Sequence, residues 1–248
     1  MIRNNINNYM DKMDKKKIFE IINELLLKID LEKSYEWKIP PNCPIEISAD
    51  IKGNYQKNIF LKKNLGQLLR KDESLDAHYW LIQEWGGIRN FKKTDNNSKR
   101  IREFKTSLLN KKLTLQTFST ISSLSKIAAF FEPNLYSIYD SRVIFTLNWL
   151  FLSNIDKPSL FPQPPSRNAI VSGIVIETLA LFSNIQYSTI PKKTAYFEYC
   201  NLLKEIATEL NDETKPYDIE MALFVAAPSV IADDIKNRTV VTINRNLQ

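Results

Sequence analysis

Glycine is scarce in this sequence, and its scarcity restricts the fold more than any other feature. Only 5 of the 248 residues are glycine, and few of these lie between apolar runs. Because tight turns between strands depend on glycine, such a chain favours helices over hairpins. The predicted fold is mainly α, with few or no strands, and residues 239–243 are expected to form a short strand or an extended tail. Outside the segment discussed below, we expect helices at residues 18–29, 56–70, 75–85, 99–109, 169–184, 194–210 and 217–227.

Changes in composition along the chain predict two helical lobes. Residues 1–16 are polar and are expected to be flexible. Residues 17–153 would form the helical part that carries the candidate site. Residues 154–168 hold four of the 11 prolines and are the best candidate for a connection between lobes. Residues 169–248 would then form a C-terminal helical lobe that packs back on the N-terminal part.

The segment 118–150 combines two short helices with an aspartate in front of a third. A helix is expected at 113–121, a turn at Ser122-Ser123-Leu124-Ser125, and a second helix at 126–131. Pro133 would end that helix, because the residue before a proline is biased away from helical angles. Residues 136–139 are expected to be extended. Asp140 would then cap a helix from 141 to about 152, whose apolar residues recur at helical spacing.

Positive charge is concentrated immediately before this segment. The whole chain has a net charge of +6. Residues 89–112 contain nine basic and two acidic residues, so this stretch alone carries 9 − 2 = +7. Such a concentration favours an anionic partner, although a solvated helix face would have the same composition. Lys99, Arg100 and Arg102 are the candidate contacts to that partner.

Cysteine and histidine are too few for most metal centres. Cys43 and Cys200 cannot build a four-cysteine cluster, and with His78 as the lone histidine most zinc arrangements are excluded. No metal or other cofactor is therefore expected. The start of the sequence lacks the apolar core of a signal peptide, and the apolar run 169–185 contains Glu177 and is expected to be a buried helix rather than a membrane span. A cytoplasmic setting without membrane association is the expectation.

The segment 118–150 resembles the catalytic core of the helix-hairpin-helix DNA glycosylase superfamily. Residues 121–125 would occupy the hairpin, Ile127-Ala128 would match the Thr-Ala that begins the next helix, and residues 138–143 would match the segment around the invariant aspartate. Lys126 falls where members that also cut the strand carry a lysine. The sequence departs from the family in having serines in place of the hairpin glycines and in a short interval of 14 positions from Lys126 to Asp140. The resemblance implies a two-lobed helical fold, and with two cysteines the chain lacks the four-cysteine iron–sulfur cluster of some members.

The resemblance also implies roles for Asp140 and Lys126. Cleavage of an N-glycosidic bond builds positive charge on the sugar, which a nearby carboxylate stabilises while it orients or deprotonates water. Asp140 fits that role, and the alternative is a helix cap without chemistry. An amine with a lowered pKa can instead attack the sugar and form a Schiff base. Lys126 is the candidate for that step, and the alternative is a simple phosphate contact.

Two further groups of residues follow from the same resemblance. The glycosylases flip the target base out of the duplex and stack it on aromatic side chains. The candidate base pocket therefore comprises Trp80, Gln83, Trp85, Tyr139 and Asn148, with core packing as the alternative for each aromatic ring. The candidate DNA-backbone contacts are Ser122, Ser123, Ser125, Lys99, Arg100, Arg102 and Arg142. Glu220 is a possible second carboxylate, unless it is exposed or engaged in a salt bridge.

The expected function is that of a monomeric DNA glycosylase acting on double-stranded DNA, in repair or in defence against phage DNA with modified bases. One alternative is a non-catalytic DNA-binding protein on the same helical fold. Another is an interaction or defence protein in which Asp140 is a helix cap only. Salt-dependent DNA binding without base release would identify the first alternative, and the absence of DNA affinity the second.

Overall fold

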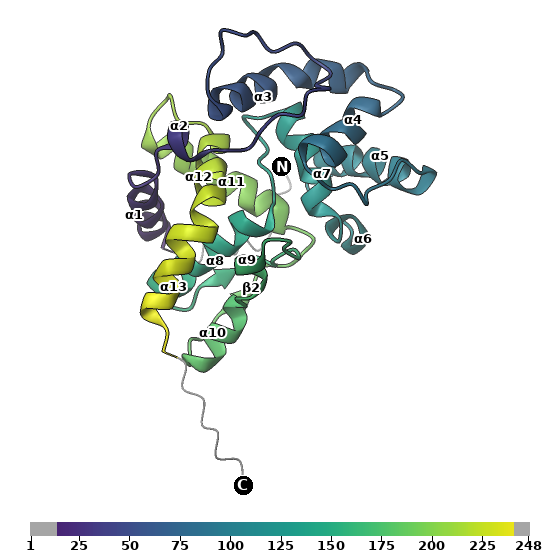
Figure 1. Ribbon diagram of the computed structural model, residues 1–248. Coiled ribbons are helices and arrows are strands. Elements are labelled where there is room, and N and C mark those ends of the chain that lie inside the picture. The colour runs from purple at the N-terminus through teal and green to yellow at the C-terminus, as the bar shows by residue number, and fades with distance from the viewer. Residues whose placement is uncertain (1–13, 241–248) are drawn as a thin grey trace, which may run out of the picture.

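The computed structural model describes residues 14–240 and is mainly α-helical, which confirms the predicted fold class (Figure 1). In the first part of the chain the helices are α1 (Lys15–Leu26), α2 (Leu31–Ser34), α3 (Asn54–Lys71), α4 (Asp76–Trp80), η2 (Leu81–Trp85, a π-helical turn), α5 (Asp95–Asn110), α6 (Leu115–Phe118) and α7 (Ile121–Phe131). In the second part they are α8 (Ser141–Asn154), α9 (Ala169–Ser172), α10 (Ile176–Phe182), α11 (Ala195–Leu210), α12 (Pro216–Ala226), η3 (Ala227–Ile231, also π-helical) and α13 (Ala232–Arg238).

The strands described between residues 14 and 240 are two pairs of residues. β1 (Ser159–Leu160) and β2 (Ser188–Thr189) run parallel, with Ser159 opposite Ser188. This small ladder anchors part of the proline-rich segment 154–168 to the stretch after α10. Of the predicted tail at 239–243, residues 241–243 lie outside the described residues, as do residues 1–13 of the predicted flexible start.

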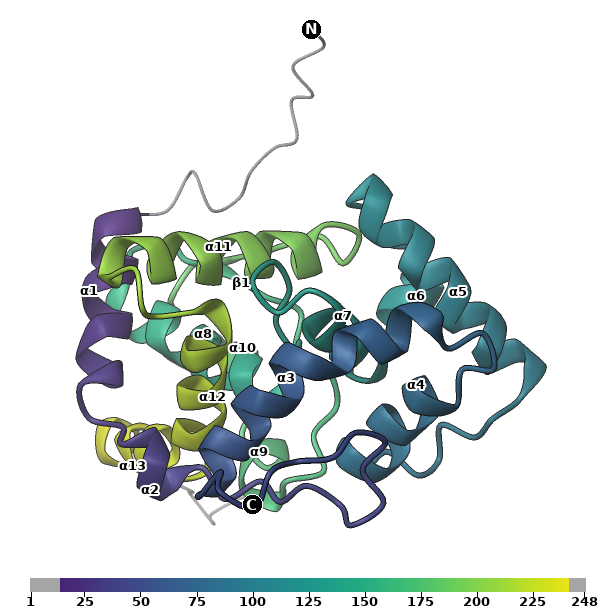
Figure 2. The ribbon, with the colours of Figure 1, turned by 90° about the horizontal axis from the view of Figure 1, so that it is seen from above.

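Helices α3 to α7 gather on one side of the molecule, and α1 and α8 to α13 on the other (Figures 1 and 2). Helix α3 connects the first group to the second: Tyr55 near its start donates its hydroxyl to Asp218 of α12 at 2.6 Å, and the helix packs against α7 (Figure 2). A single large cluster of buried apolar side chains joins both sides, from Ile18 in α1 through Ile127 in α7 to Ile235 in α13. Helix α8 is buried from Val143 to Leu152 because it is apolar on every face, so it forms the centre of the fold.

The predicted turn at Ser122–Ser125 is wrong, because all four residues belong to α7. The turn instead lies at Ser119 and Thr120, between α6 and α7. Serine at a helix start is compatible with a turn or with the first helical turn. Here Ile121, Leu124 and Ile127 continue the apolar spacing through the serines and are buried, and this packing settles the helix.

Two other predicted elements differ from the structure. Helix α5 begins at Asp95, four residues before the helix predicted at 99–109, because the Thr94 hydroxyl accepts a hydrogen bond from the Asn97 N–H at 3.2 Å and caps the helix there. The single buried helix expected at 169–184 is broken at Gly173 into α9 and α10. Its apolar side chains are also partly outside the core, since Phe182 is 78% exposed.

No helix within residues 14–240 combines the length and the apolar character needed to cross a membrane.

Candidate functional site

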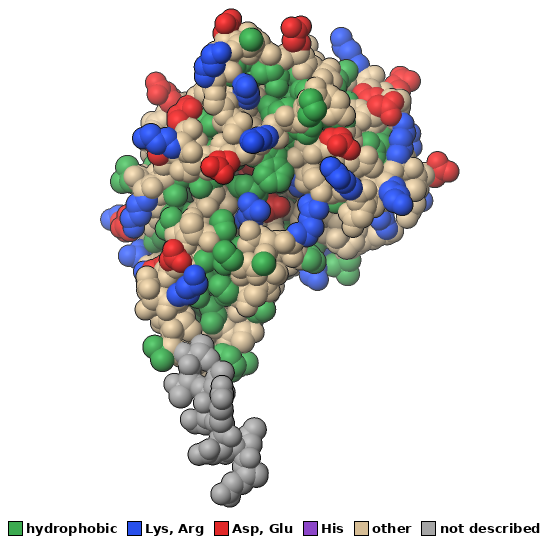
Figure 3. Space-filling view, viewed as in Figure 1, with side chains coloured by type: hydrophobic (Ala, Val, Ile, Leu, Met, Phe, Trp, Pro, Cys, Tyr) green, Lys and Arg blue, Asp and Glu red, His purple; other side chains and the backbone are tan. Residues whose placement is uncertain are grey.

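A cavity of about 460 Å³ lies where the two groups of helices meet. Its walls come from the end of η2, the start of α7, the start of α8, the proline-rich segment at 164–168, and α12. Figure 3 shows a hollow on this face, with basic and acidic side chains gathered around it and hydrophobic side chains beside them. The cavity has the size of a small-molecule site and mixes apolar walls with a few charged groups, as such sites do.

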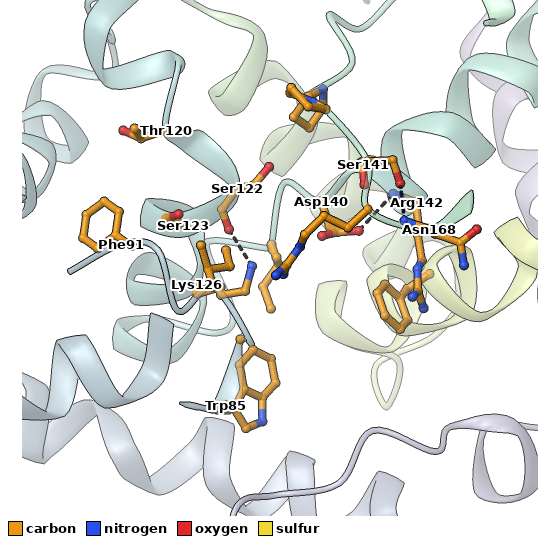
Figure 4. A pocket seen from close by; sticks show the side chains of 18 of the residues that line it. Trp85, Phe91, Thr120, Ser122, Ser123, Lys126, Asp140, Ser141, Arg142 and Asn168 are labelled. Atoms are coloured by element: carbon orange, nitrogen blue, oxygen red, sulfur yellow. Dashed lines mark hydrogen bonds between the residues drawn. The ribbon is translucent and has the colours of Figure 1, made fainter. Parts of the chain in front are cut away.

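Asp140 is fixed at the mouth of α8 by its own capping bond. The side chain accepts a hydrogen bond from the Arg142 backbone N–H at 2.9 Å, which confirms the predicted cap (Figure 4). Between residues 14 and 240, this carboxylate forms no ion pair and its second oxygen accepts no hydrogen bond. Asp140 is only half-buried and lines the cavity. One carboxylate oxygen is therefore committed to structure, and the other is available to a ligand.

The two residues before Asp140 are held by side chains from three helices. Ser125 in α7 accepts a hydrogen bond from the Tyr139 N–H at 3.0 Å. Tyr199 in α11 donates its hydroxyl to the Ile138 carbonyl at 2.9 Å. Glu220 in α12 accepts a hydrogen bond from the Ile138 N–H at 2.9 Å. This segment lies outside any helix or strand, so its backbone N–H and carbonyl groups need partners from elsewhere in the chain. The three side chains supply those hydrogen bonds and so set the position of Asp140.

Lys126 enters the cavity from α7, opposite Asp140 (Figure 4). The residue is only 5% exposed, and its ammonium donates a hydrogen bond to the Ser122 carbonyl at 2.5 Å. Burial lowers the pKa of Lys126, against the opposing effect of the negative charges on Asp140 and Glu220. Within residues 14–240, no carboxylate lies close enough to pair with the amine. The amine can therefore lose its proton more readily than an exposed lysine.

Gly86 makes room for the Lys126 side chain at the end of η2. A Cβ on Gly86 would lie 2.6 Å from Lys126 Cε and 2.7 Å from the Ile82 carbonyl oxygen. Both separations are below van der Waals contact, so a larger residue would displace the lysine stem. Gly86, which follows the last residue of η2, therefore shapes the site.

A buried ion pair stands behind Lys126 and Asp140. Lys62 in α3 lies 3.2 Å from the Glu220 carboxylate, and neither side chain is more than 5% exposed. Lys62 also lies over the ring of Phe130, 4.9 Å from its centroid. Burial raises the pKa of Glu220, while Lys62 and the Ile138 N–H act in the opposite direction. Glu220, which was considered as a possible second carboxylate, is thus salt-bridged, buried and part of the cavity lining.

Aromatic rings form one wall of the cavity. Trp85 donates its indole N–H to the Asn58 side chain at 2.8 Å, and Trp37 donates its own to the Trp85 carbonyl at 2.9 Å. Phe224 meets Trp37 edge to face, with ring centroids 5.6 Å apart. These bonds satisfy the indole nitrogens and hold the rings at fixed angles, so the wall is rigid.

Three arginines line the same cavity. The Arg142 guanidinium lies over the ring of Phe224, 4.4 Å from its centroid. Arg167 donates to the Gly87 carbonyl at 2.6 Å and so connects the proline-rich segment to the second residue after η2. Arg100 donates to the Asn97 side chain at 3.2 Å, while its Nε has no partner among the described residues. The three side chains come from different elements and place positive charge around the opening.

The structure brings seven of the sequence-predicted residues to the cavity and leaves the other seven away from it. Those that line it are Trp85, Arg100, Ser122, Ser123, Lys126, Asp140 and Arg142. Those that do not are Trp80, Gln83, Lys99, Arg102, Ser125, Tyr139 and Asn148.

Each residue away from the cavity has a structural partner or faces outwards. Tyr139 is fully buried and donates its hydroxyl to the Pro162 carbonyl at 2.9 Å. The Asn148 amide bonds both backbone groups of Phe161, at 2.8 Å each. Gln83 donates to the Phe91 carbonyl at 2.7 Å. Ser125 holds the Tyr139 N–H, as described above.

The remaining three lie on helix faces. Trp80 packs among the apolar residues between α3 and α7, with its indole N–H 3.4 Å from the Asn42 side chain. Lys99 and Arg102 are exposed on α5, where Lys99 is 3.8 Å from Glu103. Both side chains face solvent outside the cavity.

Sequence reasoning missed several lining residues, including Tyr35, Trp37, Phe91, Arg167 and Phe224. Trp37 and Tyr35 lie in an irregular segment where no periodic pattern indicates which side faces a site. Phe224 belongs to an apolar helix and resembles any core residue. Arg167 was within the proline-rich connection, and only the Asn168 cap that follows it signalled order.

In residues 14–240, no group of three or more His, Cys, Asp or Glu side chains is arranged to hold a metal ion. The charged groups at the cavity are the Lys126 amine, two carboxylates and three guanidinium groups, which suit an organic ligand carrying negative charge. Comparisons of the chain with protein-family models, with curated proteins and with solved structures find no match in any of the three.

Proposed function

We propose that the chain is a DNA glycosylase, which rotates a modified or damaged base out of duplex DNA and cleaves its N-glycosidic bond. One observation carries the proposal: a desolvated amine, Lys126, and a half-buried carboxylate, Asp140, open on the same cavity of about 460 Å³. They come from consecutive helices, and the aromatic wall stands beside them. The resemblance of residues 118–150 to the helix-hairpin-helix glycosylases supports the same chemistry, although the serines lie within α7 rather than in a turn before it.

Asp140 would act on the sugar. When the bond between the sugar C1′ and the base nitrogen breaks, the electron pair leaves with the base and positive charge develops on the sugar. The free carboxylate oxygen of Asp140 would stabilise that charge. Water would then add to C1′ and release a proton to Asp140 or to solvent, and the departing base would take up a proton from solvent. The capping bond to Arg142 holds the carboxylate in place without neutralising it.

Lys126 offers a second route. The neutral amine would add to C1′ as the base leaves, lose a proton, and form a Schiff base once the sugar ring opens. Loss of the 2′ proton and departure of the 3′ phosphate would then break the strand. Burial lowers the pKa of Lys126 and so increases the fraction of free amine at neutral pH. Whether water or Lys126 attacks decides between a simple glycosylase and one with strand-cutting activity.

The walls of the cavity support a base as the ligand. Trp85, Trp37 and Phe224 present aromatic surface on which a flipped base can stack. Arg100, Arg142 and Arg167 lie around the opening, where the phosphates on either side of a flipped nucleotide would pass. The exposed Lys99 and Arg102 on α5 extend the positive charge beyond the cavity. The protein would act on double-stranded DNA as a monomer.

The class of modified base is left to experiment, with oxidised, alkylated, deaminated and phage-modified bases as candidates, in repair or in antiphage defence. Duplexes carrying each kind of base, and modified phage DNA, are incubated with the protein, and abasic sites are counted by alkaline strand cleavage. The proposal expects base loss from at least one substrate. Salt-dependent DNA binding without base loss from any of them would contradict it and would identify the non-catalytic DNA-binding alternative.

A further inference from the structure

Glu220 is bound on one side and open on the other. Its Oε2 atom accepts hydrogen bonds from the Ile138 N–H at 2.9 Å and from Lys62 at 3.2 Å. Its other oxygen accepts none from residues 14–240, and the side chain lines the cavity. The residue is 4% exposed. The Glu220 carboxylate is therefore buried, with one oxygen hydrogen-bonded to the protein and the other free to interact with a ligand in the cavity.

The Lys62–Glu220 pair is poorly explained by stability alone. Removing two charges from water costs as much as, or more than, their mutual attraction returns, and apolar replacements of similar size often stabilise a fold. The two residues are 158 positions apart and belong to α3 and α12, so the pair is built by the tertiary fold rather than by local sequence. Its position beside the cavity, and its bond to the backbone that leads to Asp140, point to a role in the site.

Several ionisable groups face Glu220 from the elements packed around it. Lys62 comes from α3, Lys126 from α7, Tyr35 from the end of α2, and Tyr199 and Cys200 from α11. Around Lys126 the charges are Asp140 and Glu220, which favour its ammonium form, and Arg167 and Lys62, which oppose it. The amine is thus surrounded by two negative and two positive groups, and Glu220 contributes to both its charge and the placement of Asp140.

We propose that Glu220, held by Lys62, is a positioning residue of the reaction centre that fixes the backbone carrying Asp140 and places a carboxylate in the cavity wall that Lys126 also lines. This role deepens the proposed function and, for the reaction itself, rests on it. Lys62 shares the Glu220 carboxylate, and its positive charge limits how strongly that carboxylate retains the proton on Lys126.

The inference predicts effects of opposite sign for the two halves of the ion pair. Glu220→Gln retains an oxygen that can accept the Ile138 N–H but removes the negative charge, so the pKa of Lys126 falls. Lys62→Met removes a positive charge and leaves the Glu220 carboxylate unshared, so the pKa of Lys126 rises. A merely structural role would not produce shifts in opposite directions.

The measurement is an NMR titration of protein labelled with ¹³C-lysine. The Lys126 Cε signal is assigned by its absence from the Lys126→Arg variant, and circular dichroism checks that each variant is folded. The midpoint should move to lower pH in Glu220→Gln, to higher pH in Lys62→Met, and not at all in Glu209→Gln, which changes an exposed residue of α11. An unchanged midpoint in both cavity variants would overturn the inference. If one variant fails to fold, the direction in which the Lys126 midpoint moves in the other variant decides.

The titration does not depend on glycosylase activity, so the two proposals can fail separately. Adduct formation with abasic DNA under cyanoborohydride is followed against pH in the same variants, and its pH dependence should shift as the Lys126 midpoint does. Shifted NMR midpoints with no base loss and no adduct at any pH would support the role of Glu220 and contradict the glycosylase. Base loss together with unmoved midpoints would contradict the role of Glu220 alone.

Discussion

The Glu220 carboxylate accepts a hydrogen bond from the Ile138 backbone N–H at 2.9 Å, across 82 positions of sequence. The carbonyl of the same residue accepts the Tyr199 hydroxyl, also at 2.9 Å. Both polar groups of Ile138 are thus held by helices from the C-terminal part of the chain. Because Asp140 follows two residues later, the position of the candidate catalytic carboxylate depends on α11 and α12 as much as on the helix that it caps.

The bond from the Tyr139 N–H to Ser125 should contribute to stability rather than to DNA binding. Ser125→Ala leaves a buried N–H without an acceptor, which costs about 1–3 kcal/mol. The free energy of unfolding in urea measures the loss. Ser107→Ala, on the exposed face of α5, should change it by no more than about 0.5 kcal/mol. Equal effects of the two substitutions would show that the Ser125 bond is not formed.

Asn148 should also prove to be structural. Its amide satisfies the N–H and the carbonyl of Phe161, so Asn148→Ala should lower the free energy of unfolding by about 2–6 kcal/mol, at about 1–3 kcal/mol for each buried group. The exposed Asn201→Ala in α11 serves as the matched control. If Asn148→Ala instead keeps wild-type stability but no longer discriminates between bases, Asn148 contacts the base as the sequence predicted.

Local signals in the sequence located the cap and the central helix. Asp140 stands directly before a strongly apolar segment, and aspartate is among the best capping residues, so both features could be predicted. The placement of Lys126 and Asp140 at one cavity followed from their closeness in sequence, since only a short extended stretch separates the two helices. The turn predicted at residues 122–125 was wrong because the preference of serine for turns is local. The buried apolar face of α7 overrides that preference.

The rest of the site depends on contacts between distant parts of the chain. Nothing in the sequence around Lys62 indicates that it meets Glu220, and both residues resemble ordinary charged positions on helices. The tryptophans of α4 and η2 were both predicted to line the base pocket. In the structure Trp85, in the π-helical turn, lines the cavity, whereas Trp80 packs in the apolar core between α3 and α7. Which face of a helix meets a cavity is decided by its neighbours, and no single-sequence pattern contains them.

Positive charge on α5 should contribute to DNA binding without contacting the base. Lys99→Gln and Arg102→Gln should each weaken binding to duplexes of any sequence and reduce the dependence of affinity on salt by about one phosphate contact. Fluorescence anisotropy at several salt concentrations measures both. Lys236→Gln is the control, because Lys236 is equally exposed and paired with a carboxylate but lies on α13, away from the cavity. Matching losses in all three variants would contradict a binding role for α5.

The pKa of Lys126 should govern adduct formation with abasic DNA. Only the free amine attacks, so the rate should rise with pH and level off above the pKa of Lys126, which burial places below its ordinary value of 10.5. Trapping with cyanoborohydride and gel analysis follow the adduct. Lys126→Met should form none, and Lys63→Met, at an exposed lysine of α3, should behave as wild type. An adduct in Lys126→Met would assign the chemistry to another amine.

Asp140 allows the chemistry to be separated from the fold. Asparagine caps helices about as well as aspartate, so Asp140→Asn should keep the stability of the protein, whereas Asp140→Ala should lose about 1 kcal/mol. Asp156→Asn, at an exposed residue after α8, is the matched control for the loss of one negative charge.

The most direct measurement is the release of free base, followed by mass spectrometry under single-turnover conditions, with DNA binding measured on the same samples. On the substrate that the screen finds, wild type and Asp140→Asn should bind DNA with similar affinity, and Asp156→Asn should release the base at the wild-type rate. Asp140→Asn should release essentially none. Base release by Asp140→Asn at the wild-type rate would contradict the assignment of Asp140 and, with it, the proposed reaction centre.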